Sequence, residues 1–321
     1  MNGLGELRVE YEPRLVEETV FQALKGHPKG PAVRRQRDRL YEIEDAEARD
    51  AAFRRFHAAW FDRLGLGEPI DQALSEQPLI AAAVWACLVA FASSDRQEGA
   101  ELFVRSPQEG MSEVGRRSVV IRLRPETLLA PARIRAFLRH ELLHIADMLD
   151  PRFGYEPWLP SSDAGPAHRE LLKERYRVLW DAYIDGRLSR LGWAPAGTRA
   201  RRLAEFARAF PMLGGRAEEA FDCLFGSESR RHGELVAFAS DPESMIDRSS
   251  GGGRAGGCCP LCRFPTHAFE PEPRRLPHAA REAVRHDFPE WDPSAGLCLQ
   301  CADLYRARSA SPSSERLRHA G

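Results

Sequence analysis

The chain has 321 residues, of which 43% are apolar, and its 46 Lys and Arg almost balance its 47 Asp and Glu, for a net charge of −1. The length indicates about two domains, and this composition excludes a disordered chain, a collagen-like chain and a disulfide-stapled mini-protein. Because so small a charge creates no global positive field, we expect neither nucleic acid nor a membrane surface as a partner.

The sequence contains no recognisable targeting segment. It starts MNGLGELRVEYEPR, without the basic-then-apolar order of a signal peptide. The longest apolar run, residues 79–92, is shorter than the roughly 20 residues that cross a bilayer, and it predicts a buried helix. Four of the seven cysteines form two C-x-x-C pairs, which indicates metal binding rather than disulfides. We therefore expect a cytoplasmic protein.

Residues 1–95 are predicted to form a helical N-terminal region. Apolar side chains recur at helical spacing between residues 53 and 64, which predicts one buried face of an amphipathic helix. His57 lies on this face. Because no other metal-binding motif accompanies it, we interpret it as a core histidine rather than a ligand.

Two short strands, 101–105 and 118–124, are predicted next, the second because its apolar residues alternate. Pro131 begins a predicted helix that runs to Asp150, where Pro151 ends it. A further helix is expected over 167–185, ended by Gly186, and more helices within 197–247.

The sequence predicts an α+β fold that is mainly helical, with a short sheet. A Gly/Ser-rich linker at 248–257 separates a metal-binding domain, 96–247, from a small C-terminal module, 258–306. The tail, 307–321, is expected to be disordered.

The strongest motif is His140-Glu141-Leu142-Leu143-His144, an H-E-x-x-H within a predicted helix. Histidines four residues apart lie on one helix face, so both imidazoles can bind one Zn²⁺. The adjacent Glu141 can then act as general base on a metal-activated water. These residues predict a catalytic zinc site for hydrolysis at neutral pH.

A strand, an H-E-x-x-H helix and a downstream helix with an acidic residue together resemble the zincin metallopeptidases. The resemblance covers roughly residues 100–190. It is a distant similarity, to thermolysin-like or SprT-like zincins. It implies a zincin-like catalytic domain, a peptide or protein substrate, and a substrate that pairs with the strand before the helix, here 118–124. The implied function is that of a cytoplasmic zinc metallopeptidase.

Zinc needs a third protein ligand, for which Asp181 is the first candidate. Asp181-x-x-x-Asp185 resembles the E-x-x-x-D of thermolysin-like zincins, with Asp in place of the ligating Glu. The resemblance implies that Asp181 binds zinc and that Asp185 orients a ligating histidine. If the resemblance is accidental, the two aspartates are a solvated acidic face.

Two other residues are candidates for this ligand. His168 follows His144 at the start of a helix, as the third histidine does in SprT-like proteases, although Arg169 replaces their usual glycine. Asp150 stands at the metzincin position, where Asp147 replaces the glycine that metzincins use for a turn.

A second zinc site is predicted from Cys259, Cys262, Cys298 and Cys301. Two C-x-x-C pairs can complete a tetrahedral four-thiolate site, which leaves no position for water and is therefore structural. The spacer is longer than the commonest pattern, so His267, His278 or His286 could replace one cysteine. We interpret residues 258–306 as a zinc ribbon, Cys258 as a spare thiol, and Cys87 and Cys223 as buried core thiols.

Two functions follow from these motifs. The first is a zinc-dependent hydrolase with one catalytic and one structural zinc ion. The alternative is a non-catalytic zincin-like adaptor whose ribbon docks to a protein or nucleic-acid partner. The C-terminal module has nearly equal numbers of arginine and acidic residues, which disfavours nucleic acid. The presence of Glu141 favours the enzyme, because a structural metal site does not need a general base.

Overall fold

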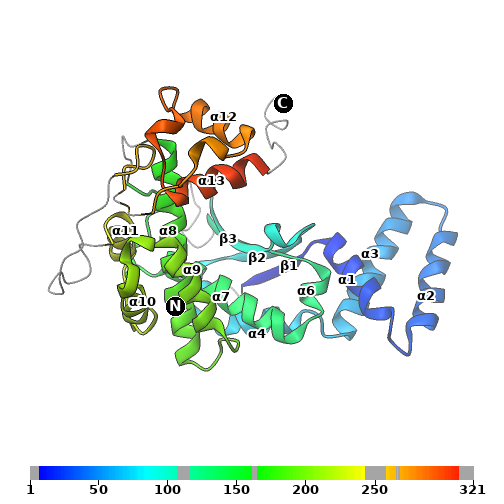
Figure 1. Cartoon of the computed structure of the whole chain (residues 1–321). Coiled ribbons are helices and arrows are strands. Elements are labelled where there is room, and N and C mark those ends of the chain that lie inside the picture. Colours follow the sequence, from blue (N-terminus) through cyan, green and yellow to red (C-terminus); the bar gives the residue numbers. More distant parts are fainter. Residues whose placement is uncertain are drawn as a thin grey trace. The chain divides into compact units, whose positions relative to one another are not determined.

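The structure is a computed structural model that describes residues 7–106, 116–160, 165–242, 258–264, 266 and 268–310 (Figure 1). It divides into two compact units, Met1–Tyr155 and Glu156–Gly321. The chain is mainly helical, with one small sheet and a C-terminal cysteine cluster, as the sequence predicts. Among the helices described, none combines the length and the apolarity that a membrane crossing requires.

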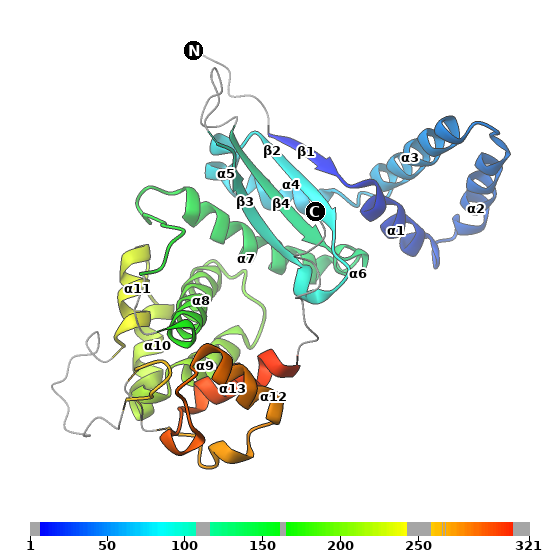
Figure 2. The same cartoon turned by 90° about the horizontal axis from the view of Figure 1, so that it is seen from above.

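The first unit contains a four-stranded mixed sheet in the order β1-β2-β4-β3 (Figure 2). β1 (Arg8–Tyr11) runs parallel to β2 (Ala86–Phe91), and β2 runs parallel to β4 (Arg117–Leu123). β3 (Gly99–Val104) lies antiparallel to β4 at the edge of the sheet. β3 and β4 confirm the two strands predicted from the sequence.

The predicted helix over residues 79–92 is wrong. A short helix, α5 (Pro78–Ala83), is followed by β2, so two elements share the apolar run. β2 lies between two parallel strands, with Cys87 and Val89 fully buried. An internal parallel strand has the same continuous apolar pattern as a buried helix, which explains the error. β1 and β2 therefore correct the expectation that residues 1–95 are all helical.

The predicted substrate edge is also wrong. β4, which contains most of the predicted strand 118–124, is paired on both sides, by β2 and by β3. The antiparallel β3 occupies the edge instead. Its backbone groups, not those of β4, are therefore the ones that an added strand could pair with on this side.

Helices α4 (Glu68–Ser75) and α7 (Pro131–Leu149) lie on one face of the sheet (Figure 1), and α5 packs against both of these helices. From α7, side chains at helical spacing enter the core and are fully buried: Ile134, Leu138, Leu142 and Ile145. α7 confirms the helix predicted from Pro131 to Asp150, with Asp150 as its C-cap. The short α6 (Pro125–Leu128) connects β4 to α7.

Three further helices of the first unit are α1 (Pro13–Leu24), α2 (Gly30–Asp38) and α3 (Ala46–Arg63), with the 3₁₀ turn η1 (Arg39–Glu42) before α3. α3 confirms the predicted amphipathic helix. His57 is 5% exposed and lies beside the buried Trp60 and Phe61 on its inner face. The interpretation of His57 as a buried histidine is therefore confirmed.

The second unit is built on α8 (Pro166–Arg190), against which α9 (Thr198–Ala209), α10 (Ala217–Phe225) and α11 (His232–Ser240) pack. α9, α10 and α11 confirm the helices expected within 197–247. α8 does not end at Gly186 as predicted but continues to Arg190. Gly186 does not cap the helix; its missing side chain lets α8 and α10 come close together. A Cβ atom at this position would lie 2.0 Å from the carbonyl oxygen of Phe225 at the end of α10.

The C-terminal module belongs to the second unit and contains α12 (His278–Asp287) and α13 (Leu299–Ala310). Within its described residues there is no strand, only an isolated bridge between Phe269 and Cys298, so the expectation of a β-ribbon is corrected to a helical module. The predicted linker, 248–257, lies outside the described residues. So do residues 311–321 of the predicted disordered tail, whereas 307–310 belong to α13.

Candidate metal centres

His140, Glu141 and His144 lie on α7, all partly buried. The Nε2 atoms of the two histidines are 3.3 Å apart. Two nitrogen ligands of a tetrahedral zinc ion, each at about 2.05 Å, are separated by about 3.3 Å. The pair therefore has the spacing of two zinc ligands, although the same distance also suits an N–H···N hydrogen bond between the rings.

The carboxylate of Glu141 is held by the edge strand. Its Oε2 atom accepts a hydrogen bond of 3.0 Å from the backbone N–H of Ala100 in β3. Arg105 donates its backbone N–H to Arg116 across the β3–β4 pair, so odd-numbered residues of β3 face β4. In an antiparallel strand the backbone groups of alternate residues point to opposite sides, so Ala100, Leu102 and Val104 direct theirs to the open edge. Glu141 thus lies at the open edge of the sheet.

The position of α7 is fixed on both sides of the motif. Leu142, which lies between the two histidines in sequence, and Ile145, which follows His144, are fully buried in the core. Arg139 makes a two-pronged ion pair with Glu76, at 2.7 and 2.8 Å. These contacts determine which face of the helix carries His140 and His144.

Asp181 and Asp185 lie on α8, in the second unit, and are not a solvated acidic face. They are 7% and 4% exposed. Arg202 of α9 donates to Asp185 at 2.6 Å and to Asp181 at 3.1 Å, and Arg177 also donates to Asp181, at 2.7 Å. Burial alone lowers the pKa of the Arg202 guanidinium, but the two aspartates raise it above its ordinary value. Sequence reasoning missed this buried charge cluster.

The other two candidates for the third ligand have local partners. The Nδ1 atom of His168 lies 2.8 Å from the carbonyl oxygen of Cys262, and its ring stacks on Phe264 at 4.4 Å. Asp150 forms a two-pronged ion pair with Arg152, with distances of 3.0 to 3.2 Å. His168 thus packs against the cysteine cluster.

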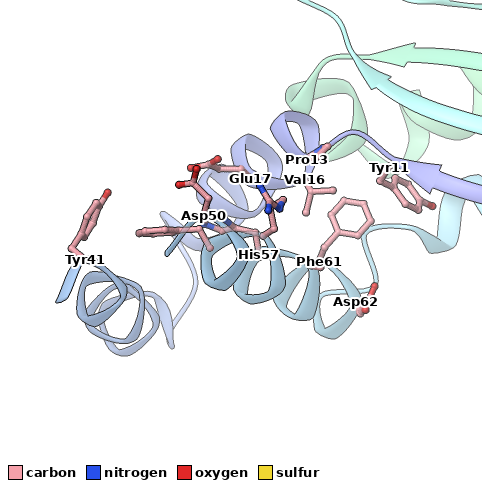
Figure 3. Close-up of a pocket in the computed structure, with 12 residues that line it drawn as sticks. Tyr11, Pro13, Val16, Glu17, Tyr41, Asp50, His57, Phe61 and Asp62 are labelled. Carbon is pink, nitrogen blue, oxygen red and sulfur yellow. The ribbon is translucent and has the colours of Figure 1, made fainter. Parts of the chain in front are cut away.

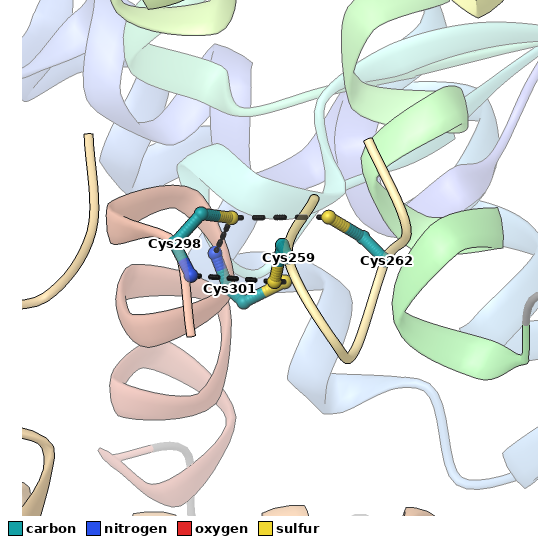
Figure 4. A group of neighbouring side chains, drawn as sticks. All are labelled: Cys259, Cys262, Cys298 and Cys301. Carbon is teal, nitrogen blue, oxygen red and sulfur yellow. Dashed lines mark hydrogen bonds between the residues drawn. The ribbon is translucent and has the colours of Figure 1, made fainter. Parts of the chain in front are cut away.

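The four predicted cysteines form a buried cluster (Figure 4). The Sγ atoms of Cys259 and Cys301 are 3.9 Å apart, those of Cys262 and Cys298 are 3.8 Å apart, and all four lie within 4.8 Å of one another. A tetrahedral zinc ion with Zn–S distances of about 2.3 Å needs sulfur atoms about 3.8 Å apart. The cluster could therefore hold a zinc ion, and no histidine is needed to complete it.

Backbone geometry shapes this cluster. Arg263 has a positive φ of 59° and donates its N–H to the carbonyl of Cys259, which closes the first turn. The N–H groups of Cys298 and Cys301 point at the sulfurs of Cys259 and Cys298, at 3.3 and 3.4 Å. N–H groups aimed at sulfur favour the thiolate form that a metal requires. His278 and His286 do not join the cluster, and His267 lies outside the described residues.

A buried cation accompanies the four thiols. Arg175 of α8 is 1% exposed, and its guanidinium lies 4.0 Å from the centre of the Phe264 ring. It donates one hydrogen bond, to Gln300, while its Nε and Nη1 atoms have no hydrogen-bond partner. Burial lowers the pKa of Arg175 to about 10, and the thiols of the cluster act in the opposite direction.

The remaining cysteines are not ligands of this cluster. Cys87 is buried in β2, where burial raises the pKa of its thiol to about 12, which confirms its interpretation as a core thiol. Cys223 is exposed, so the expectation that it is buried is wrong. Cys258 is also exposed.

Comparisons with protein-family models, with curated protein sequences and with solved structures found no match.

Proposed function

We propose that the protein is a zinc-dependent hydrolase, specifically a peptidase, whose site is built on His140, Glu141 and His144. The observation that carries this proposal is the 3.3 Å separation of the two Nε2 atoms, with the Glu141 carboxylate on the neighbouring residue of the same helix. Two nitrogen ligands and a carboxylate base are what a hydrolytic zinc site requires of a single helix.

In this proposal the chain's own groups position the substrate and move the proton. An extended peptide adds to the open edge of β3, pairing with the backbone of Leu102 and Val104. Glu141, oriented by the N–H of Ala100, takes a proton from the attacking water and passes it to the leaving amine. Zinc, when bound, supplies a lowered water pKa and polarises the scissile carbonyl.

Asp181 remains the proposed third ligand, with Asp185 as a residue that positions the ligands. The partners of Asp181 are compatible with this role, since ligating carboxylates are themselves commonly oriented by hydrogen bonds. Arg177 and Arg202 both donate to the same oxygen of Asp181, Oδ2. Asp150 is a weaker candidate because Arg152 engages both of its carboxylate oxygens, and His168 is weaker because its ring packs on the cysteine cluster, with Nδ1 at the carbonyl of Cys262.

A non-catalytic adaptor is the second candidate function. Its supporting observation is the four-cysteine cluster, a closed site that leaves no position for a reacting water. On this proposal the two histidines bind no zinc ion, and the cysteine module serves a protein contact. The two candidates differ in the number of zinc ions that the protein binds.

The first test is zinc content of the full-length protein, measured by mass spectrometry of the metal, for three proteins: the wild type, His144→Ala, and Cys298→Ser/Cys301→Ser. We expect about two zinc ions per chain in the wild type and about one in each variant. One zinc ion in both the wild type and His144→Ala would reject the catalytic site and leave the adaptor.

The second test separates binding from chemistry. Glu141→Gln is expected to keep its zinc and to lose cleavage of a quenched fluorescent peptide library by at least about 100-fold, because a general base is removed. Asp181→Asn is expected to lose the zinc ion bound by His140 and His144, whereas Asp150→Asn, its matched control, keeps it. Equal zinc binding by Asp181→Asn and the wild type would show that another residue is the ligand.

A further inference from the structure

A pocket of about 610 Å³ lies in the first unit between the start of α1, the turn η1 and the helix α3 (Figure 3). Its volume is within the range of pockets that bind small molecules. All of its lining residues fall between Tyr11 and Asp62, so it is far along the chain from the H-E-x-x-H motif. The metal sites assign no function to it.

The pocket is acidic, and its charges are unpaired. Glu17, Asp50 and Asp62 line it together with a single cation, Arg54. Within the described part of the chain, no hydrogen bond or ion pair engages these four side chains. Other acids of the chain do form ion pairs, such as Glu18, which pairs with Arg14 on the same helix as Glu17. A net charge of about −2 therefore faces solvent in a concave site.

Aromatic side chains form part of the same pocket. Tyr41 and Phe53 pack edge to face with ring centres 4.9 Å apart, and Tyr41 is 65% exposed. Phe53 in turn stacks with the buried His57 at 6.1 Å. Burial lowers the pKa of His57, and Glu17 opposes this shift only in part, so His57 is neutral at physiological pH and does not cancel the acidic charge.

We propose that this pocket binds a cationic side chain, a guanidinium or ammonium group on an aliphatic stem, presented by a partner or substrate protein. The carboxylates of Glu17 and Asp50 match the charged end. The exposed face of Tyr41 provides a cation–π surface, and Val16 and Phe61 provide an apolar wall for the stem. A basic side chain is the group that satisfies both the acidic and the apolar parts of the pocket.

The proposal depends on the pocket alone and not on the metal sites. If the peptidase site exists, the pocket would recognise a basic residue of the substrate away from the scissile bond. If it does not, the pocket would still bind a basic segment of a partner. Failure of the zinc experiments therefore leaves this proposal standing, and the reverse also holds.

The test is calorimetric titration of the full-length protein with N-acetyl-arginine amide and with N-acetyl-citrulline amide, which has almost the same shape but no charge. We expect a dissociation constant of about millimolar for the arginine ligand, as is usual for a ligand of this size, and at least about fivefold weaker binding of the citrulline ligand. Binding of the arginine ligand is expected to weaken as salt concentration rises.

Variants locate the binding. Glu17→Gln/Asp50→Asn is expected to weaken the arginine ligand about tenfold, and Tyr41→Ala about threefold. The matched control, Glu44→Gln/Glu47→Gln, removes the same charge from exposed positions that do not line the pocket and should leave binding unchanged. Because Tyr41 is exposed, its replacement should not unfold the protein. No binding of the arginine ligand, equal binding of the citrulline ligand, or equal loss in the control variant would overturn the proposal.

Discussion

Arg175 is a buried cation next to four cysteines, and two of its guanidinium nitrogens, Nε and Nη1, have no hydrogen-bond partner. Four thiolates around Zn²⁺ carry a net charge of −2, so the guanidinium would offset part of that charge when the metal is bound. Without the metal, the same cation is costly to keep buried. Arg175 should therefore affect the metal-bound and the metal-free protein in opposite directions.

We expect Arg175→Met to weaken zinc binding at the cysteine cluster at least about tenfold, because a compensating charge is lost. Competition with a chelator, in a His144→Ala background, measures this affinity. The metal-free protein should be as stable as before or more stable, since an incompletely paired buried charge is removed. Arg208→Met on α9 is the control. Unchanged zinc affinity, or loss of stability in both forms, would assign Arg175 a packing role only.

For the two buried aspartates, the sequence predicts their position on the helix but not their burial. The spacing of Asp181 and Asp185 predicts that they share a helix face, and both lie close to Arg202. Their burial could not be predicted, because the residue that makes it possible lies on another helix. Nothing in the sequence distinguishes Arg202 from the other arginines of α9.

Gly186 determines how closely two helices of the second unit approach. It lies inside α8, where alanine would normally be favoured by about 1 kcal/mol. The Phe225 carbonyl of α10 occupies the space of a Cβ atom, and this contact is with backbone, which cannot move aside as a flexible side chain can. The glycine is therefore required by packing, not by a turn.

Gly186→Ala is expected to destabilise the protein by at least about 2 kcal/mol, because α8 and α10 must separate. Gly233→Ala is the matched control: this glycine is also helical, and no atom lies within 4 Å of the added Cβ, so the change should be neutral or stabilising by up to about 1 kcal/mol. Urea denaturation of both variants measures the difference. Similar midpoints for the two would contradict the close approach.

The secondary structure could be predicted where the local pattern is distinctive. α7 begins with a proline and repeats apolar residues at helical spacing, and β4 alternates buried and half-buried residues. β1 and β2 could not be predicted because β1 is only four residues long and β2 is internal. The sheet order was also inaccessible, since an edge strand differs from an internal one only in its partners.

The four cysteines are part of a larger core rather than of an independent module. Ala167 and Leu171 of α8 pack in one apolar cluster with Cys259, Cys301 and residues of α12 and α13. Tyr305 and Trp291 complete this core, and the hydroxyl of Tyr305 donates to Asp287 at 2.8 Å. The predicted linker suggests two separable parts, yet the C-terminal module depends on a helix that precedes it. A metal ion bound by the cysteines would thus stabilise elements on both sides of residues 248–257.

Removal of the metal should therefore loosen one unit and not the other. With zinc chelated, we expect amide hydrogen exchange to accelerate by at least about tenfold in α12, α13 and the start of α8, because metal binding is coupled to folding of the elements around it. β2 and β4 of the first unit, whose core contains none of the four cysteines, should keep their protection. Cys298→Ser/Cys301→Ser should reproduce the effect of the chelator, whereas Cys223→Ser/Cys258→Ser, at exposed positions, should not. Unchanged exchange in α12 and α13 after verified loss of zinc would mean that apolar packing alone holds this core, and that the cysteines contribute through burial and not through a metal ion.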